Sequence, residues 1–231
     1  MSAKGDKRVT SNKIIFAFAL LFISAAGLRA QAPNATALPM DAAGHPDLSG
    51  YWELRWDSKS VPRAALTPEF QKSDAQAKAR EDDIKSVRAC TPVGMPGVMD
   101  NASTIDLRQS PKFIGVIAKV PSSARYIYTD GRKHPDKDEL DATTNGNSMG
   151  RWEGDTLVVD TIGFNDRGLR SLPGGGMRTP DSHLVERFKL INADVLSVTF
   201  TWDDPKVFRT PHSYEYRYYR TEITNPRLLA C

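Results

Sequence analysis

Gly150-Arg-Trp-Glu-Gly-Asp-Thr-Leu-Val-Val-Asp-Thr161 sets the polar turn 153–155 between an aromatic-bearing arm and a run of β-branched residues. Gly154 supplies the positive φ that a tight turn needs, and Val and Thr suit a pleated, half-buried surface. The stretch therefore predicts a β-hairpin.

Similar signals recur along the chain. Pro121–Ser123 and Asn192–Asp194 are typical turns between apolar runs of strand length. Besides the two arms of the first hairpin, strands are expected at 47–54, 113–120, 124–129, 183–191, 195–202 and 213–220. About eight strands with short connections predict an all-β fold, an antiparallel up-and-down barrel.

One early helix interrupts this pattern. Thr67 is a good N-cap and Pro68 suits the first helical position. The residues from there to about Ser86 are helix formers with few apolar positions, which predicts a surface helix. The Pro- and Gly-punctuated segment 90–97 and the Gly-rich segment 172–176 are expected to be loops.

The first 32 residues have the pattern of a signal peptide, with a basic start, an apolar run at 14–28 and a small-x-small site ending at Ala32. A cut after Ala30 is the second choice, and an uncleaved anchor is the alternative. Residues 33–46 are expected to be a flexible leader, and 47–231 a single β-barrel domain. This organisation predicts a periplasmic or secreted protein with no membrane span in the mature chain.

Removing the signal changes the charge of the protein. Residues 1–32 hold five basic residues and one acidic residue, so the whole-chain charge of +3 becomes −1 for the remainder. The mature chain therefore lacks the basic surface that nucleic-acid binding requires. Cys90 and Cys231 could pair in an oxidising compartment, or they could remain independent thiols.

The chain also resembles known families. The first strand, Gly50-Tyr-Trp52, and the hairpin order that follows resemble the calycins, which include lipocalins and fatty-acid-binding proteins. Tyr128-Thr-Asp-Gly-Arg-Lys-His-Pro135 and the 150–161 motif resemble the hallmarks of a family of exported bacterial proteins. The resemblance implies a barrel fold and an extracytoplasmic location, and it implies no activity.

Candidate site residues follow from the two-residue period of the strands. Glu186 shares a face with Leu184 and Phe188, so it is expected either to meet a hydrogen-bonding cation or to have a raised pKa. A structural pair with an arginine from a neighbouring strand is the alternative. Arg132 and His134 face one side near the barrel rim, where they could hold an anion or transfer a proton.

The leading functional hypothesis is a barrel that binds a small, partly apolar molecule in its interior. The second is an enzyme on the same scaffold, a lyase, isomerase or hydrolase, with His134 and Glu186 as acid and base. The third is an envelope interaction module. The predicted ligand-binding residues are Arg132, Trp52, Trp152, Phe188, Phe200, Trp202, Tyr216 and Tyr218. The identity of the ligand and the oligomeric state stay open.

Little in the sequence indicates a metal or a cofactor. The histidines have no ligand spacing, although His134 and His183 could converge in space. No cofactor motif is present. Asp155 and Asp160 are best explained by turn capping and solvation at a strand edge.

Overall fold

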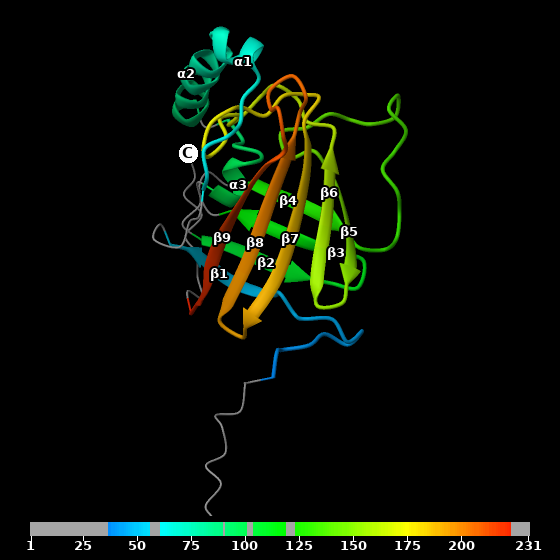
Figure 1. Ribbon diagram of the computed structural model, residues 1–231. Coiled ribbons are helices and arrows are strands. Elements are labelled where there is room, and N and C mark those ends of the chain that lie inside the picture. Colours follow the sequence, from blue (N-terminus) through cyan, green and yellow to red (C-terminus); the bar gives the residue numbers. More distant parts are fainter. Residues whose placement is uncertain (1–36, 56–60, 90, 101–103, 119–122, 223–231) are drawn as a thin grey trace, which may run out of the picture. The chain divides into compact units, whose positions relative to one another are not determined.

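The computed structural model describes residues 37–55, 61–89, 91–100, 104–118 and 123–222. Within these residues, nine strands form a closed barrel (Figure 1). In chain order they are β1 (Gly50–Leu54), β2 (Thr104–Gln109), β3 (Phe113–Ala118), β4 (Ser123–Tyr128), β5 (Asn147–Glu153), β6 (Thr156–Ile162), β7 (His183–Asn192), β8 (Val195–Asp203) and β9 (His212–Thr221).

Each strand pairs with the next along the chain, and β1 pairs with β9 to close the wall. The pairs are antiparallel except β4 and β5, which run parallel where Ile127 faces Ser148. The predicted all-β barrel is therefore confirmed, with nine strands in place of about eight. The additional strand is β2, whose only apolar residues are Ile105 and Leu107. Two apolar positions among polar ones are too weak a signal to indicate a strand.

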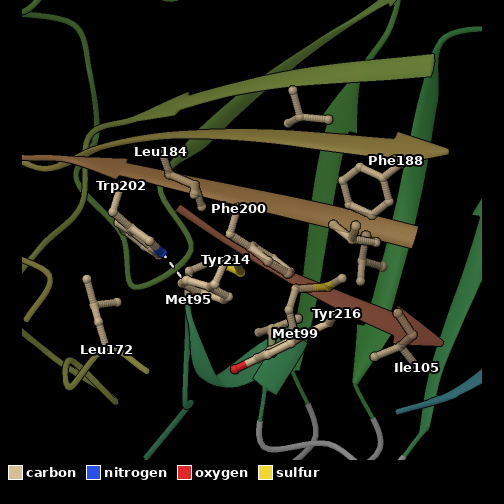
Figure 2. Close-up of a cluster of buried hydrophobic side chains, with 14 of the residues drawn as sticks. Met95, Met99, Ile105, Leu172, Leu184, Phe188, Phe200, Trp202, Tyr214 and Tyr216 are labelled. Atoms are coloured by element: carbon tan, nitrogen blue, oxygen red, sulfur yellow. Dashed lines mark hydrogen bonds between the residues drawn. The ribbon is translucent and has the colours of Figure 1, made fainter. Parts of the chain in front are cut away.

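Buried residues alternate with less buried ones along β7 and β9, as predicted, and the buried ones build the interior of the barrel. On β7 the buried set includes Leu184, Glu186 and Phe188, while Arg187 and Lys189 are exposed. β8 and β9 add a dense group of aromatic residues to the same core. Figure 2 shows part of this core, with Phe200, Tyr214 and Tyr216 lying together.

Residues 93–100, called here the inserted segment, are more than the predicted loop. They include the short helix α3 (Gly97–Asp100), and Met95 and Met99 are buried in the core (Figure 2). Tyr218 donates a hydrogen bond through its hydroxyl to the Met99 carbonyl at 2.6 Å, and Tyr216 donates one to Asp100 Oδ1 at 2.7 Å. The protein thus fills part of its own core with a segment rich in Pro and Gly.

The predicted single helix is two helices, α1 (Pro68–Lys72) and α2 (Ala75–Arg88). Thr67 caps α1 as expected, because its hydroxyl accepts a hydrogen bond from the Phe70 N–H at 3.2 Å. Ser73 ends α1 with an extended backbone, and its hydroxyl donates to the Phe70 carbonyl at 2.7 Å. Ala79 is the one buried residue of α2, which makes α2 a surface helix as predicted.

The predicted signal peptide, Cys90 and Cys231 lie outside the described residues. Of the predicted leader, residues 37–46 are described, and they contain a turn in which Asp41 Oδ1 accepts hydrogen bonds from the Ala43 and His45 N–H groups. Gln109 on β2 donates to the other oxygen of Asp41 at 2.8 Å. None of the helices in the described part of the chain has the length and apolar character needed to cross a bilayer.

Candidate functional site

A cavity of about 640 Å³ lies where residues 63–66, helix α2 and the Gly-rich segment meet. These elements lie together at one end of the barrel, called here the mouth (Figure 1). Residues 63–66 and the 172–175 segment form two walls, and α2 forms the third. Helix α2 contributes Gln76, Ala77 and Arg80, and Ser73, which ends α1, also lines the cavity. The spacing of Gln76, Ala77 and Arg80 places them on one face of the helix.

Hydrogen bonds hold the three walls in position. The Ala64 N–H donates to the Gly174 carbonyl at 3.0 Å, and His212 Nε2 donates to the Pro173 carbonyl at 2.6 Å. On α2, the Asp83 carboxylate accepts from the Arg170 and Ser171 N–H groups at 2.7 and 3.0 Å. Every wall is therefore bonded to a neighbouring one or to the barrel.

Gly174 is required for the close approach of two of these walls. Its φ of +79° disfavours a side chain, and a Cβ atom there would lie 2.2 Å from the Pro62 carbonyl oxygen. Gly175 lies on the open side, where a Cβ atom would meet nothing closer than 3.8 Å. The Gly-rich segment thus forms a thin wall of backbone beside the cavity.

The lining of the cavity is mixed in polarity. Leu172 is 5% exposed and belongs to the hydrophobic core, and Ala64 and Leu66 add apolar surface. Arg63, Arg80, Gln76 and Ser73 supply polar groups, and no Asp or Glu is among the lining residues. A concave site that combines apolar side chains with convergent polar groups can hold a small molecule.

The aromatic residues predicted to bind a ligand are packed within the barrel. Trp52, Phe188, Phe200, Trp202, Tyr216 and Tyr218 are each at most 1% exposed. Trp52 donates its indole N–H to the Leu48 carbonyl at 2.9 Å, and Trp202 donates to the Tyr214 hydroxyl at 3.1 Å. Burial raises the pKa of Tyr216 and Tyr218 well above the ordinary value, so both hydroxyls remain donors. The polar atoms of these rings have partners within the chain.

Trp152 lies apart from that group. It is partly buried, and it stacks on His45 of the N-terminal turn with ring centroids 4.8 Å apart and planes 5° from parallel. The structure therefore places this predicted ligand-binding residue against the protein's own histidine.

Glu186 meets a cation, which was one of the two outcomes expected for it. Arg125 on β4 forms a two-pronged ion pair with the carboxylate, with Nη1 to Oε1 at 2.9 Å and Nη2 to Oε2 as the second contact. The guanidinium also donates to the hydroxyls of Ser148 and Thr161 at 2.9 Å each. Both partners are at most 1% exposed. The pair is three strands apart in the wall, so it is not a contact between neighbouring strands.

Asp160 forms a second polar cluster on the outside of the barrel, and this corrects the prediction that it serves only solvation at a strand edge. His134 Nε2 lies 2.9 Å from its Oδ1, and His183 Nε2 lies 2.8 Å from its Oδ2. His134 Nδ1 lies 2.7 Å from Asn147 Oδ1. Histidines 49 residues apart in the chain thus meet on one carboxylate, a convergence that the sequence left open.

A smaller cavity of about 290 Å³ adjoins this cluster, and both Arg132 and His134 line it. Arg132 is already paired with Asp130 Oδ2 at 2.6 Å, and its guanidinium carbon lies 4.2 Å from the centre of the Tyr128 ring. Among the described residues, no group of three or more His, Cys, Asp or Glu has the arrangement of a metal site.

The structure does not bring His134 and Glu186 together. His134 bonds to Asp160 on the outer face of β6, whereas the next residue, Thr161, is fully buried and bonds to Arg125 beside Glu186. Successive residues of a strand point to opposite faces. The acid and base of the enzyme hypothesis therefore lie on opposite sides of the barrel wall, and proton transfer needs hydrogen-bond reach or a bridging water.

The outer cluster predicts a pH dependence of stability. The hydrogen bond to Asp160 raises the pKa of His183 above its ordinary 6.5. Protonated His183 therefore stabilises the fold fully below pH 6.5, and this stabilisation is lost as the pH rises through the raised folded-state pKa. The hydrogen bond from His183 lowers the pKa of Asp160 below 3.8. The stabilisation by the ionised Asp160 carboxylate is therefore lost only as the pH falls through that lowered value. The contribution is therefore greatest between these two limits.

We expect the free energy of unfolding to fall as the pH rises from about 6 to about 8, by less than about 1 kcal/mol because the pair is partly exposed. His183→Gln should flatten this slope, and urea titrations at several pH values measure it. An unchanged slope in that variant would show that other groups cause the dependence.

The fold and the cavity together define a closed β-barrel with a ligand-sized cavity at its mouth. No protein-family model and no curated protein matches the chain. Among solved structures, the chain is similar to a point mutant of the fluorescent protein UnaG, with 13% sequence identity and a TM-score of 0.35. The match covers 75% of this chain and 96% of that chain.

Proposed function

We propose that this protein is an exported β-barrel that binds a small, partly apolar molecule in the cavity at its mouth. The observation that carries the proposal is the cavity itself. Its volume of about 640 Å³ falls within the range of roughly 300–1,000 Å³ that is usual for ligand sites. Its lining combines the apolar side chains of Ala64, Leu66 and Leu172 with polar groups from Arg63 and α2, which is what a partly apolar ligand requires.

We place the ligand site at the mouth and not in the barrel interior, because polar side chains that have no partner in the described part of the chain lie at the mouth. The buried tryptophans and tyrosines bond within the chain, and the inserted segment contacts the aromatic core. Leu172 connects the two regions, since it lines the cavity and also belongs to the core. Export is proposed from the basic start, the apolar run and the small-x-small site of residues 1–32.

Filling the cavity should prevent binding. Ala77 lines the cavity on α2, and a tryptophan there would project into the space that the ligand needs. We expect Ala77→Trp to weaken binding of the neutral fluorescent probe phenylnaphthylamine by about tenfold or more, which corresponds to about 1.4 kcal/mol. Fluorescence titration measures this change.

Lys78→Trp is the matched control, because Lys78 is on the same helix, does not line the cavity and is 68% exposed. Both variants should retain the thermal midpoint of the parent, since surface substitutions have small effects on stability. Parent-like affinity in a folded Ala77→Trp variant would show that the probe binds elsewhere, and the proposal would then be wrong.

A further inference from the structure

Two arginines face the mouth cavity without a partner. Among the described residues, neither Arg63 nor Arg80 makes an ion pair or a side-chain hydrogen bond. Other arginines near loops are paired, such as Arg170 with Asp82 at 2.7 Å. Because no carboxylate lines the cavity, two positive charges from separate segments face the same space without a negative one.

One further hydrogen-bond donor lies beside these arginines. The side-chain amide of Gln76 can donate hydrogen bonds to an anion, and Gln76 lines the cavity. Asp74 makes no side-chain capping bond at the start of α2, and its carboxylate pairs instead with Lys78 at 2.8 Å. The Asp74 carboxylate is therefore engaged by Lys78 and is not part of the cavity lining.

Leu66, Leu172 and Ala64 supply the apolar part of the cavity lining. A ligand that satisfies both parts of the lining carries an anionic head for the arginines and an apolar body for the leucines. Guanidinium groups bind carboxylate, phosphate and sulfonate oxygens through charge-assisted hydrogen bonds.

We infer that the molecule bound at the mouth is an amphiphilic organic anion, with Arg63 and Arg80 as the residues that select its charged head. This inference rests on the proposed function. It goes further by naming the chemical class of the ligand and the two residues that distinguish an anion from a neutral molecule of the same shape.

Two fluorescent probes with one skeleton test the inference. Anilinonaphthalene sulfonate carries a sulfonate, and phenylnaphthylamine is its neutral counterpart. The parent protein should bind the sulfonate more tightly. Arg63→Gln and Arg80→Gln should each weaken sulfonate binding by about tenfold, and should change binding of the neutral probe by no more than about twofold.

Arg88→Gln is the control for loss of positive charge. Arg88 is on the same helix, eight residues after Arg80, and it does not line the cavity. Its replacement should change neither probe's affinity. Circular dichroism and thermal melting confirm that each variant is folded before it is titrated.

The outcomes separate the two proposals. If Ala77→Trp removes binding of both probes while the arginine variants leave the ratio of the two affinities unchanged, the cavity binds ligands but the anion class is wrong. If Ala77→Trp changes neither affinity, both proposals are wrong. A loss of sulfonate binding alone in Arg63→Gln and Arg80→Gln, with Arg88→Gln unchanged, supports the inference.

Discussion

Glu186→Gln is expected to lower the free energy of unfolding by about 3–5 kcal/mol. The side chain keeps its size, so no void forms, but the Arg125 guanidinium is left buried without a counter-charge. Its hydrogen bonds to Ser148 and Thr161 remain, and hydroxyls do not neutralise a cation. Urea unfolding with an unchanged m-value measures the loss.

The control for this prediction removes both charges. Replacing a buried ion pair by apolar residues of similar volume is often neutral or stabilising. Arg125→Met combined with Glu186→Leu should therefore recover most of the stability that Glu186→Gln loses. If the double variant is as unstable as the single one, the hydrogen bonds of the pair to its neighbours matter more than charge neutrality.

Arg178→Met is the second change with a large expected effect. Arg178 is fully buried, and it donates to three backbone carbonyls: Met95 at 2.7 Å, Arg167 at 2.5 Å and Asn165. Burial lowers the pKa of Arg178 to about 10, with a smaller effect from Arg170. Removing the guanidinium leaves three acceptors unsatisfied, and we expect a loss of about 3 kcal/mol or more, since each buried acceptor costs about 1–3 kcal/mol.

The hydrogen bond from Arg178 to the Met95 carbonyl connects this prediction to the inserted segment. Without Arg178, residues 93–100 lose a bond that holds them to the 165–178 region, so their amide protons should exchange faster than those of β7 or β8. Arg178→Lys should recover part of the stability, because one ammonium keeps the charge but has fewer donors in fixed directions. A variant as stable as the parent would mean that the desolvation of the guanidinium cancels its three hydrogen bonds.

The strand pattern was predictable because alternation is a local property of the sequence. It placed Glu186 on the apolar face of β7 and Phe200 with Trp202 on the same face of β8, and burial confirms both. The inserted segment was not predictable in the same way. Pro and Gly mark where a chain turns, but they do not show that Met95 and Met99 pack against the rings of β9.

The candidate site was less accessible to prediction than the fold. The cavity draws Arg63, Arg80 and Leu172 from segments that share no motif, and only the closed wall brings them together. Asp160 was similarly hidden, because a carboxylate on the polar face of a strand is ordinary until two histidines reach it. The alternation of residues along a strand shows which face of the sheet a side chain is on, and it does not show which other residues contact that side chain.

The parallel pairing of β4 and β5 determines how this wall can close. In a meander of nine strands in which each reverses the last, the first and ninth would run in the same direction and could only meet in parallel. Because β4 and β5 run in the same direction, every strand after β4 is reversed relative to that simple meander. As a result, β9 meets β1 antiparallel. The long connection 129–146 (Figure 1) makes this possible, because it returns the chain to the end from which β4 began. A tight turn in its place would reverse five strands and leave the seam mismatched.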